Sequence, residues 1–158
     1  MSGPSNEEIV HAYARASAEL DLDALASLRH PDWSVLWPQS GEQVKGSDSY
    51  AEIVTRYPGG RPRSTVGRIV GGEDRWVVTG ANTVVRVAGT GDAWWGEWLV
   101  TYPDGQLYHC VDLIELREGK VYRETVYWAP PFDAPDWRRP FVTMREASPS
   151  YLNCVVPV

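Results

Sequence analysis

The sequence predicts an α+β fold, cone-shaped, in which three N-terminal helices pack on a curved antiparallel sheet that encloses a pocket. Apolar residues recur at helical spacing in the first third of the 158-residue chain, whereas Val-, Thr- and aromatic-rich runs separated by turn residues fill the rest. Helices followed by strands indicate α+β rather than alternating α/β. We expect one domain at residues 1–147 and a loose tail at residues 148–158.

The first helix is expected over about residues 6–20. The run Ser5-Asn6-Glu7-Glu8 has the form of a capping box, and Tyr13 lies on the apolar stripe that follows it. Asp21 is then placed to cap a short second helix, which Pro31 ends.

A short strand is predicted at residues 33–37, before Pro38. A third helix follows, with Ser47 or Asp48 as its cap and Pro58 as its stop. The apolar residues of this helix are expected to face inward, namely Tyr50, Ile53, Val54 and Tyr57.

The remaining chain predicts a meander of strands at residues 65–70, 75–88, 94–102, 107–117 and 120–128. Turns are expected at residues 71–74, 90–92 and 103–105, where Gly, Asp and Pro cluster. The Pro- and aromatic-rich segment 129–141 is expected to be an ordered, extended arm rather than a helix.

The strand predicted at residues 94–102 is apolar on both faces. Trp94, Trp98 and Val100 share one face, and Trp95 and Leu99 share the other. A sheet with one solvated face alternates apolar and polar residues instead. We therefore expect one face to pack on the helices around a pocket and the outer face to be covered by a second subunit, giving a homodimer.

Bulk properties exclude several classes of partner. The net charge of −6 argues against nucleic acid or an anionic membrane. Cys110, Cys154 and three scattered histidines have no metal-ligand spacing, so we expect no metal and no cofactor. No apolar run approaches the ~20 residues of a membrane span, and the N-terminus lacks a signal core, so a cytoplasmic protein is expected.

Asp112 is the most informative residue because it lies within the apolar strand that precedes the Glu118-Gly119 turn. A carboxyl group in such a place must be solvated, paired or held protonated. A protonated carboxyl donates a hydrogen bond at neutral pH, which suits a small-molecule pocket. A structural carboxylate satisfied by the backbone or by a hydroxyl is the alternative.

The strand around Asp112, the helix motif His11-Ala12-Tyr13-Ala14 and the order of elements over residues 6–137 resemble the nuclear transport factor 2-like superfamily, and within it SnoaL-like and ketosteroid-isomerase-like proteins. The resemblance implies a curved sheet around the first helix and a conical cavity. It implies that Tyr13 and Asp112 form an oxyanion hole. Trp37, in the segment Ser34-Val35-Leu36-Trp37-Pro38, occupies the place of the proton-shuttling aspartate of the isomerases, and a tryptophan cannot accept that proton.

Two further resemblances are less informative about chemistry. The C-terminal runs at residues 119–128 and 131–137 resemble a SnoaL-like subgroup of mostly uncharacterised bacterial proteins. Limonene-epoxide-hydrolase relatives use two aspartates bridged by an arginine. Asp112 could be one member of such a set, and the sequence offers no match for the other two.

Other residues are candidates for the site. His109 could be a general base. Strand alternation, however, places its side chain on the other face of the sheet from Asp112 unless a bulge intervenes, and an interface or surface histidine is then expected. Glu97 and Glu124 could be bases facing the cavity, or halves of ion pairs with Arg86 or Arg123. Trp37, Trp98 and Tyr108 are candidate cavity walls, and plain core is the alternative for these three.

Together these observations predict a cofactor-free enzyme that acts on a mid-sized, apolar, oxygenated molecule, polyketide- or terpenoid-like. The reaction would be a proton transfer, cyclisation, dehydration or isomerisation. The alternative is a non-catalytic ligand-binding or interaction module on the same fold. Two or more titratable groups that converge on one point of the pocket would favour the enzyme.

Overall fold

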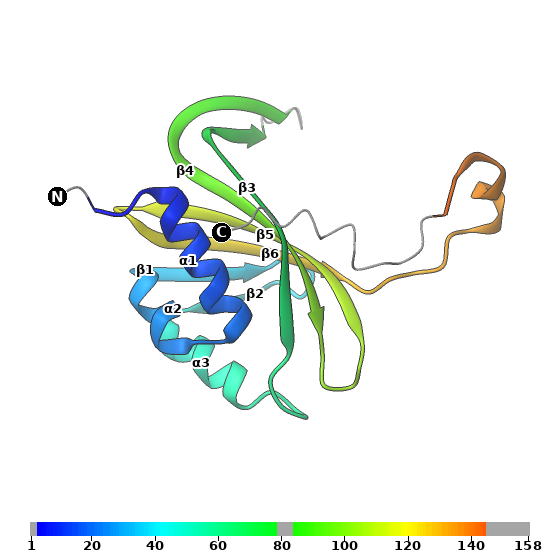
Figure 1. Cartoon of the computed structure of the whole chain (residues 1–158), viewed down its shortest axis with the longest axis horizontal. Coiled ribbons are helices and arrows are strands. Elements are labelled where there is room, and N and C mark those ends of the chain that lie inside the picture. The colour runs from blue at the N-terminus through cyan, green and yellow to red at the C-terminus, as the bar shows by residue number, and fades with distance from the viewer. Residues whose placement is uncertain (1–2, 79–83, 145–158) are drawn as a thin grey trace.

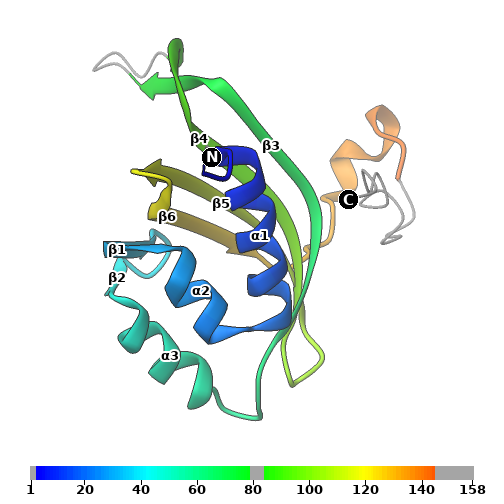
Figure 2. The ribbon, with the colours of Figure 1, turned by 60° about the vertical axis from the view of Figure 1, so that its left-hand side comes forward.

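The computed structural model describes residues 3–78 and 84–144. Within these residues, three α-helices lie on the concave side of one strongly curled, six-stranded sheet that forms a half-barrel (Figures 1 and 2). The helices are α1 (Asn6–Glu19), α2 (Leu22–Leu28) and α3 (Ser47–Thr55). The strands are β1 (Arg29–Trp37), β2 (Glu42–Lys45), β3 (Arg63–Val78), β4 (Val84–Thr101), β5 (Leu107–Arg117) and β6 (Lys120–Ala129), in the spatial order β2-β1-β6-β5-β4-β3.

The predicted caps of the first two helices are confirmed. The Ser5 amide donates to Glu8 Oε2 at 2.7 Å and the Glu8 amide donates to Ser5 Oγ at 3.3 Å, which completes the capping box of α1. Asp21 Oδ1 accepts from the Ala24 amide at 3.0 Å and so caps α2. Helix α2 ends at Leu28, and β1 begins at once with Arg29, four residues before the predicted strand.

Helix α3 differs from the prediction at its start, whereas its predicted inward face is confirmed. Its N-cap is Gly46, with φ of 79°, and neither Ser47 nor Asp48 caps it through a side chain. Tyr50, Ile53, Val54 and Tyr57 all line the cavity between the helices and the sheet, as predicted, although Ile53 is 40% exposed. The ring of Tyr50 contacts the ring of Trp33 edge-on, with 5.7 Å between the two ring centroids.

Two predicted turns are irregularities inside long strands. Strand β3 continues through residues 71–74, with a register shift between Gly72 and Asp74, and β4 continues through residues 90–92. Because Gly72 pairs with Ala93 and Asp74 pairs with Ala88, residues 89–92 of β4 stand opposite the single residue 73 of β3. Extra residues on one strand increase its local twist, which helps the sheet curl. The chain between β3 and β4, residues 79–83, lies outside the described residues. The predicted turn at residues 103–105 is confirmed, because Gly105 donates to the Tyr102 carbonyl at 2.9 Å.

The sheet is mixed, not wholly antiparallel as predicted. Strand β1 runs parallel to β6, with Ser34 opposite Arg123 and Val35 opposite Glu124. The chain between these strands includes α3 and the β3–β5 meander, so β1 meets β6 without a hairpin between them. The short strand β2 was not predicted, because Val44 is its only buried residue and its pattern is otherwise charged or polar.

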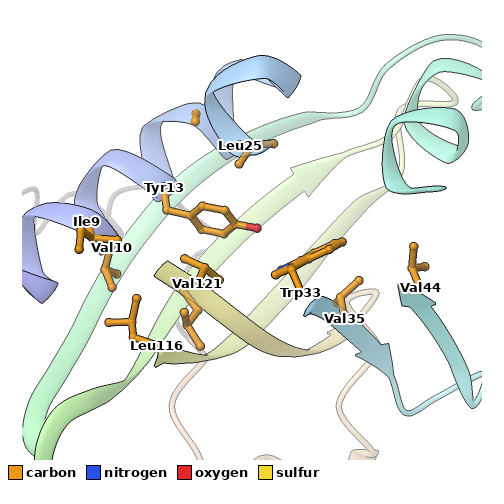
Figure 3. Close-up of a cluster of buried hydrophobic side chains, with 11 residues drawn as sticks. Ile9, Val10, Tyr13, Leu25, Trp33, Val35, Val44, Leu116 and Val121 are labelled. Carbon is orange, nitrogen blue, oxygen red and sulfur yellow. The ribbon is translucent and has the colours of Figure 1, made fainter. Parts of the chain in front are cut away.

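A hydrophobic core fills the space between α1, α2 and strands β1, β5 and β6 (Figure 3). Val10, Leu25 and Val121 are fully buried, and Figure 3 shows Tyr13 reaching from α1 toward Trp33. Burying an aliphatic side chain of this size contributes roughly 1.5–3 kcal/mol. This core holds α1 against the sheet and so fixes one wall of the cavity.

After β6 the chain leaves the body of the fold as an arm (Figure 1). It is extended up to Pro135, as predicted, but a 3-10 helix forms at Asp136–Phe141 where an extended chain was expected. Phe132 and Trp137 on this arm are 81% and 69% exposed.

Candidate functional site

A cavity of about 410 Å³ lies between the helices and the concave face of the sheet. This volume is within the usual range for small-molecule pockets. Its walls are mainly apolar and rich in aromatic residues, and its polar groups include Arg29, Asp112 and Glu124. The aromatic residues that line it include Tyr13, Trp33, Trp37, Tyr50, Trp98, Tyr102, Tyr108 and Trp128.

A hydrogen-bond network joins three elements at one side of the cavity. Tyr13 Oη, from α1, donates to Glu124 Oε1 of β6 at 2.5 Å. Trp33 Nε1, from β1, donates to the same oxygen at 2.7 Å. Arg29 Nε, also from β1, donates to Tyr13 Oη at 2.8 Å. Glu124 is therefore fixed in position by two donors on one of its oxygens.

Arg29 is buried among aromatic rings, and the sequence analysis did not find it. Its guanidinium carbon lies 3.5 Å from the Trp33 ring centroid, 4.4 Å from that of Tyr50 and 5.5 Å from that of Tyr13. Such cation–π contacts are strongest where the cation is desolvated, and Arg29 is only 6% exposed. No local sequence signal marks this role, because the three rings come from three separate elements.

Asp112 lies on β5, on the same inner face as Glu124. It is opposite Val126 of β6, and Glu124 is two residues from Val126, so the two carboxyl groups are diagonal neighbours. Burial raises the pKa of Asp112 well above its usual value; the negative charge of Glu124 and a hydrogen bond with it act in the same direction, and Arg29 opposes them. Asp112 is 6% exposed, and its Oδ1 has no hydrogen-bond partner.

The predicted pairing of Tyr13 with Asp112 as two donors to one ligand oxygen does not form. Both side chains line the cavity, as expected. However, the single Tyr13 proton is directed to Glu124, so it is not available to a ligand. Burial, and then the charge of Glu124, raise the pKa of Tyr13 well above its usual value, which keeps the hydroxyl protonated.

The structure separates the remaining candidates into two groups. Trp37, Trp98, Tyr108 and Glu124 line the cavity. His109 and Glu97 lie on the outer face of the sheet, because they alternate with the inward-facing Cys110 and Trp98. Neither of these two residues can act as the base for a ligand in this cavity.

Glu124 was correctly chosen as a cavity residue, but its expected ion pair with Arg123 is wrong. Arg123 is exposed and lies over the ring of Tyr122, 4.7 Å from its centroid, on the other face of β6. The side chain of Arg86 is outside the described residues. The partners of Glu124 are instead the hydroxyl of Tyr13 and the indole of Trp33.

Within residues 3–78 and 84–144, no group of three or more His, Cys, Asp or Glu side chains has the arrangement of a metal site. In the same residues, no helix has the length and apolarity needed to cross a bilayer.

The chain belongs to the SnoaL-like domain family, whose sequence profile matches residues 10–124. No curated protein sequence matches the chain at a significant level. A nuclear transport factor 2-like protein of unknown function from Burkholderia xenovorans is 30% identical, with 89% of this chain and 94% of that chain covered and a TM-score of 0.68.

Two further solved structures share the fold at lower identity. A candidate ketosteroid isomerase from Kribbella flavida is 21% identical, with 90% of each chain covered and a TM-score of 0.69. A candidate polyketide cyclase from Pseudomonas putida is 20% identical, with 85% of this chain and 96% of that chain covered and a TM-score of 0.56. The fold thus supports several chemistries, and the residues of this cavity must distinguish among them.

Proposed function

We propose that this protein is a cofactor-independent enzyme that acts on a mid-sized, largely apolar, oxygenated molecule, polyketide- or terpenoid-like, bound in the cavity. The observation that carries the proposal is Asp112, a buried carboxyl group whose pKa is raised and which lies beside a second carboxyl group, Glu124, in an aromatic pocket. Two carboxyl groups with different environments form the usual acid and base of such sites.

In the proposed reaction, Asp112 is the acid. It donates a hydrogen bond or a proton to a ligand oxygen, and so stabilises an enolate or an alkoxide. Glu124 Oε1 is occupied by Tyr13 and Trp33, and Glu124 also shares a hydrogen bond with Asp112. In the proposed step the ligand replaces this hydrogen bond, so that Asp112 donates to the ligand oxygen and Glu124 Oε2 accepts the proton that leaves the ligand. Proton transfer, cyclisation, dehydration and isomerisation all consist of such steps.

The test is exchange of the α-hydrogens of a ketone probe, 2-acetylnaphthalene, in deuterated water, followed by NMR. We expect the wild type to accelerate exchange, and Asp112→Asn to lower the enzymatic rate by about 10²–10⁴-fold. Glu115→Gln on the outer face of the same strand is the matched control, and its rate is expected to equal the wild type's. A wild-type rate equal to that of buffer, or an unchanged rate in Asp112→Asn, would contradict the proposal.

A second candidate function is a non-catalytic binding module. Trp37 favours it, because it occupies the place of the isomerase base and contacts Trp128 edge-on at 5.6 Å as part of the cavity wall. In that case the ketone probe would bind in the cavity without any faster exchange of its α-hydrogens.

We also propose that the protein is a cytoplasmic homodimer that associates through the outer face of the sheet. Leu107, Val111 and Leu113 alternate along β5 and are 37–43% exposed, and Tyr127 on β6 is 45% exposed. Cys110 is a free, buried thiol, which is compatible with a reducing compartment.

A further inference from the structure

Arg29 has more hydrogen-bond donors than its surroundings satisfy. A guanidinium carries five N–H groups and accepts no hydrogen bond. Arg29 Nε donates to Tyr13 Oη at 2.8 Å, and one further hydrogen bond joins Arg29 to the Tyr50 side chain. Within the described residues the other N–H groups have no partner, so three of the five donors remain, on a side chain that is 6% exposed and lines the cavity.

These remaining donors are open to the cavity. Within the described residues, the fully buried side-chain nitrogen and oxygen atoms without a partner belong to Trp98 and Asp112, not to Arg29. The Nη atoms of Arg29 therefore keep contact with the cavity space, where a ligand atom can reach them. Because a buried polar group without a partner is costly, a ligand that supplies acceptors here is favoured.

The positive charge of Arg29 also lacks a direct counterion. Among the described residues, the ion pairs with an N···O distance of 4.0 Å or less do not include Arg29. Glu124 is connected to Arg29 through the Tyr13 hydroxyl, and Asp112 shares its hydrogen bond with Glu124. A buried charge without a direct partner is unfavourable, so the cavity favours a negatively charged group beside Arg29.

The aromatic rings around Arg29 fix the orientation of its guanidinium plane. The guanidinium carbon lies 3.5 Å from the Trp33 ring centroid, a distance that places it over the face of the indole. It lies 4.4 Å from the ring centroid of Tyr50, which contacts Trp33 edge-on. With one face against Trp33, the guanidinium makes its remaining hydrogen bonds in its own plane. Arg29 is thus preorganised for a planar acceptor.

We propose that Arg29 binds the carboxylate of an aromatic or polycyclic carboxylic acid in this cavity. A carboxylate has two oxygens in one plane, which match a pair of guanidinium N–H groups, and it supplies the single negative charge that is missing. Within the described residues Arg29 is the only Lys or Arg in the cavity wall, which disfavours a doubly charged phosphate. The aromatic lining holds the apolar body of the acid.

The other acidic groups of the cavity are compatible with this anion. Glu42 and Asp104 line the cavity but are exposed, so solvent screens their charges. Arg29 opposes the raised pKa of Asp112, so a carboxylate that neutralises Arg29 raises this pKa further and keeps Asp112 protonated. This inference rests on the proposed function in treating the cavity as a ligand site, and it adds the acidic group of the ligand and the residue that selects it.

The experiment compares two probes of nearly the same shape, 2-naphthoate and the neutral 2-naphthamide. Calorimetry measures both affinities at pH 7 for the wild type, Arg29→Gln, and Arg123→Gln as the matched control, an exposed arginine that lies over the ring of Tyr122. We expect the wild type and Arg123→Gln to bind the naphthoate about ten- to hundredfold more tightly than the amide, and Arg29→Gln to lose this preference. Unchanged binding of the amide shows that a variant has kept its fold and its cavity.

A titration of the ligand on the wild type decides the matter even if Arg29→Gln does not fold. With a ¹³C-labelled carboxyl group, NMR follows the protonation of naphthoate free and bound. A guanidinium beside the carboxylate stabilises its charged form, so the pKa of the bound acid should be lower than that of the free acid. Contact with Asp112 and Glu124 instead of Arg29 would raise it.

Several outcomes would overturn the inference: no binding of naphthoate, no preference over the amide in the wild type, a preference that Arg29→Gln retains, or a bound acid whose pKa is unchanged or raised. The outcome for the proposed catalysis is separate. Binding of naphthoate through Arg29 without faster α-hydrogen exchange of the ketone probe would support this site and contradict the catalysis. Faster exchange without a preference for naphthoate would do the reverse.

Discussion

The residues of the cavity differ in how far the sequence identified them. Asp112 was predictable because a single carboxyl group within an apolar strand has few acceptable environments. Arg29 was not, since an arginine at the end of a short helix is ordinary, and its burial depends on rings from α1, β1 and α3. Tyr13 was identified as a cavity residue, but its expected role as a donor to a ligand is wrong because its hydroxyl donates a hydrogen bond to Glu124.

Tyr13→Phe tests whether the Tyr13 hydroxyl is structural. The change leaves Arg29 Nε without its acceptor and removes one donor from Glu124, so the free energy of unfolding should fall by about 1–3 kcal/mol. Urea denaturation measures this. Tyr122→Phe removes a hydroxyl that accepts from the exposed Arg123, and it should change stability by less than about 0.5 kcal/mol. An equal change in the free energy of unfolding for the two substitutions would show that the buried hydrogen bonds of Tyr13 stabilise the fold no more than the exposed hydrogen bond of Tyr122.

The raised pKa of Asp112 predicts a pH-dependent stability. Because the folded state holds this proton more tightly than the unfolded state, the folded state binds more protons above the unfolded pKa of about 4. The contribution is fully present below that pH and is lost as the pH rises through the folded pKa. The free energy of unfolding should therefore decline from pH 5 to pH 8 in the wild type and decline less in Asp112→Asn, as measured by urea denaturation at each pH. Parallel pH profiles would contradict this.

At the scale of elements, local signals predicted the helices and long-range pairing determined the sheet. The caps of α1 and α2 involve residues three apart, so the sequence displays them directly. Residues 71–74 and 90–92 look like turns, but pairing between β3 and β4 continues on both sides and makes them part of long strands. The parallel pairing of β1 with β6 joins residues almost ninety apart, a separation that no local pattern records.

The capping box of α1 allows a test at this scale. Ser5→Ala removes the acceptor of the Glu8 amide and should lower the free energy of unfolding by about 1 kcal/mol. Ser49→Ala, at an exposed position in the first turn of α3 where no side chain caps the helix, is the matched control and should be neutral or slightly stabilising. Thermal denaturation of both variants measures the difference. A Ser5→Ala protein as stable as the wild type would show that α1 is held by its packing alone.

At the scale of the whole molecule, the sheet has two faces that carry apolar side chains in different surroundings. The inner face meets the helices and lines the cavity, whereas the outer face exposes Val111, Leu113 and Tyr127. The alternation along β5 is regular in burial, with every second residue from Cys110 to Leu116 buried. The outer positions nevertheless carry apolar side chains, which are unusual on a surface that stays in water.

Leu113→Glu tests the proposed homodimer. Leu113 is 43% exposed in the single chain and is flanked across the sheet by Trp95 and Thr125, so it lies within the outer face. If this face is buried between two copies, symmetry places two new carboxylates in one interface, where they are desolvated and close to each other. Sedimentation at micromolar concentration should then show a dimer for the wild type and a monomer for Leu113→Glu.

Glu52→Gln on the exposed side of α3, far along the chain from β5, should leave the dimer intact. A monomeric wild type would refute the dimer outright, and a dimeric Leu113→Glu would place the interface on another surface, for which the exposed Phe132 and Trp137 of the C-terminal arm are the next residues to substitute.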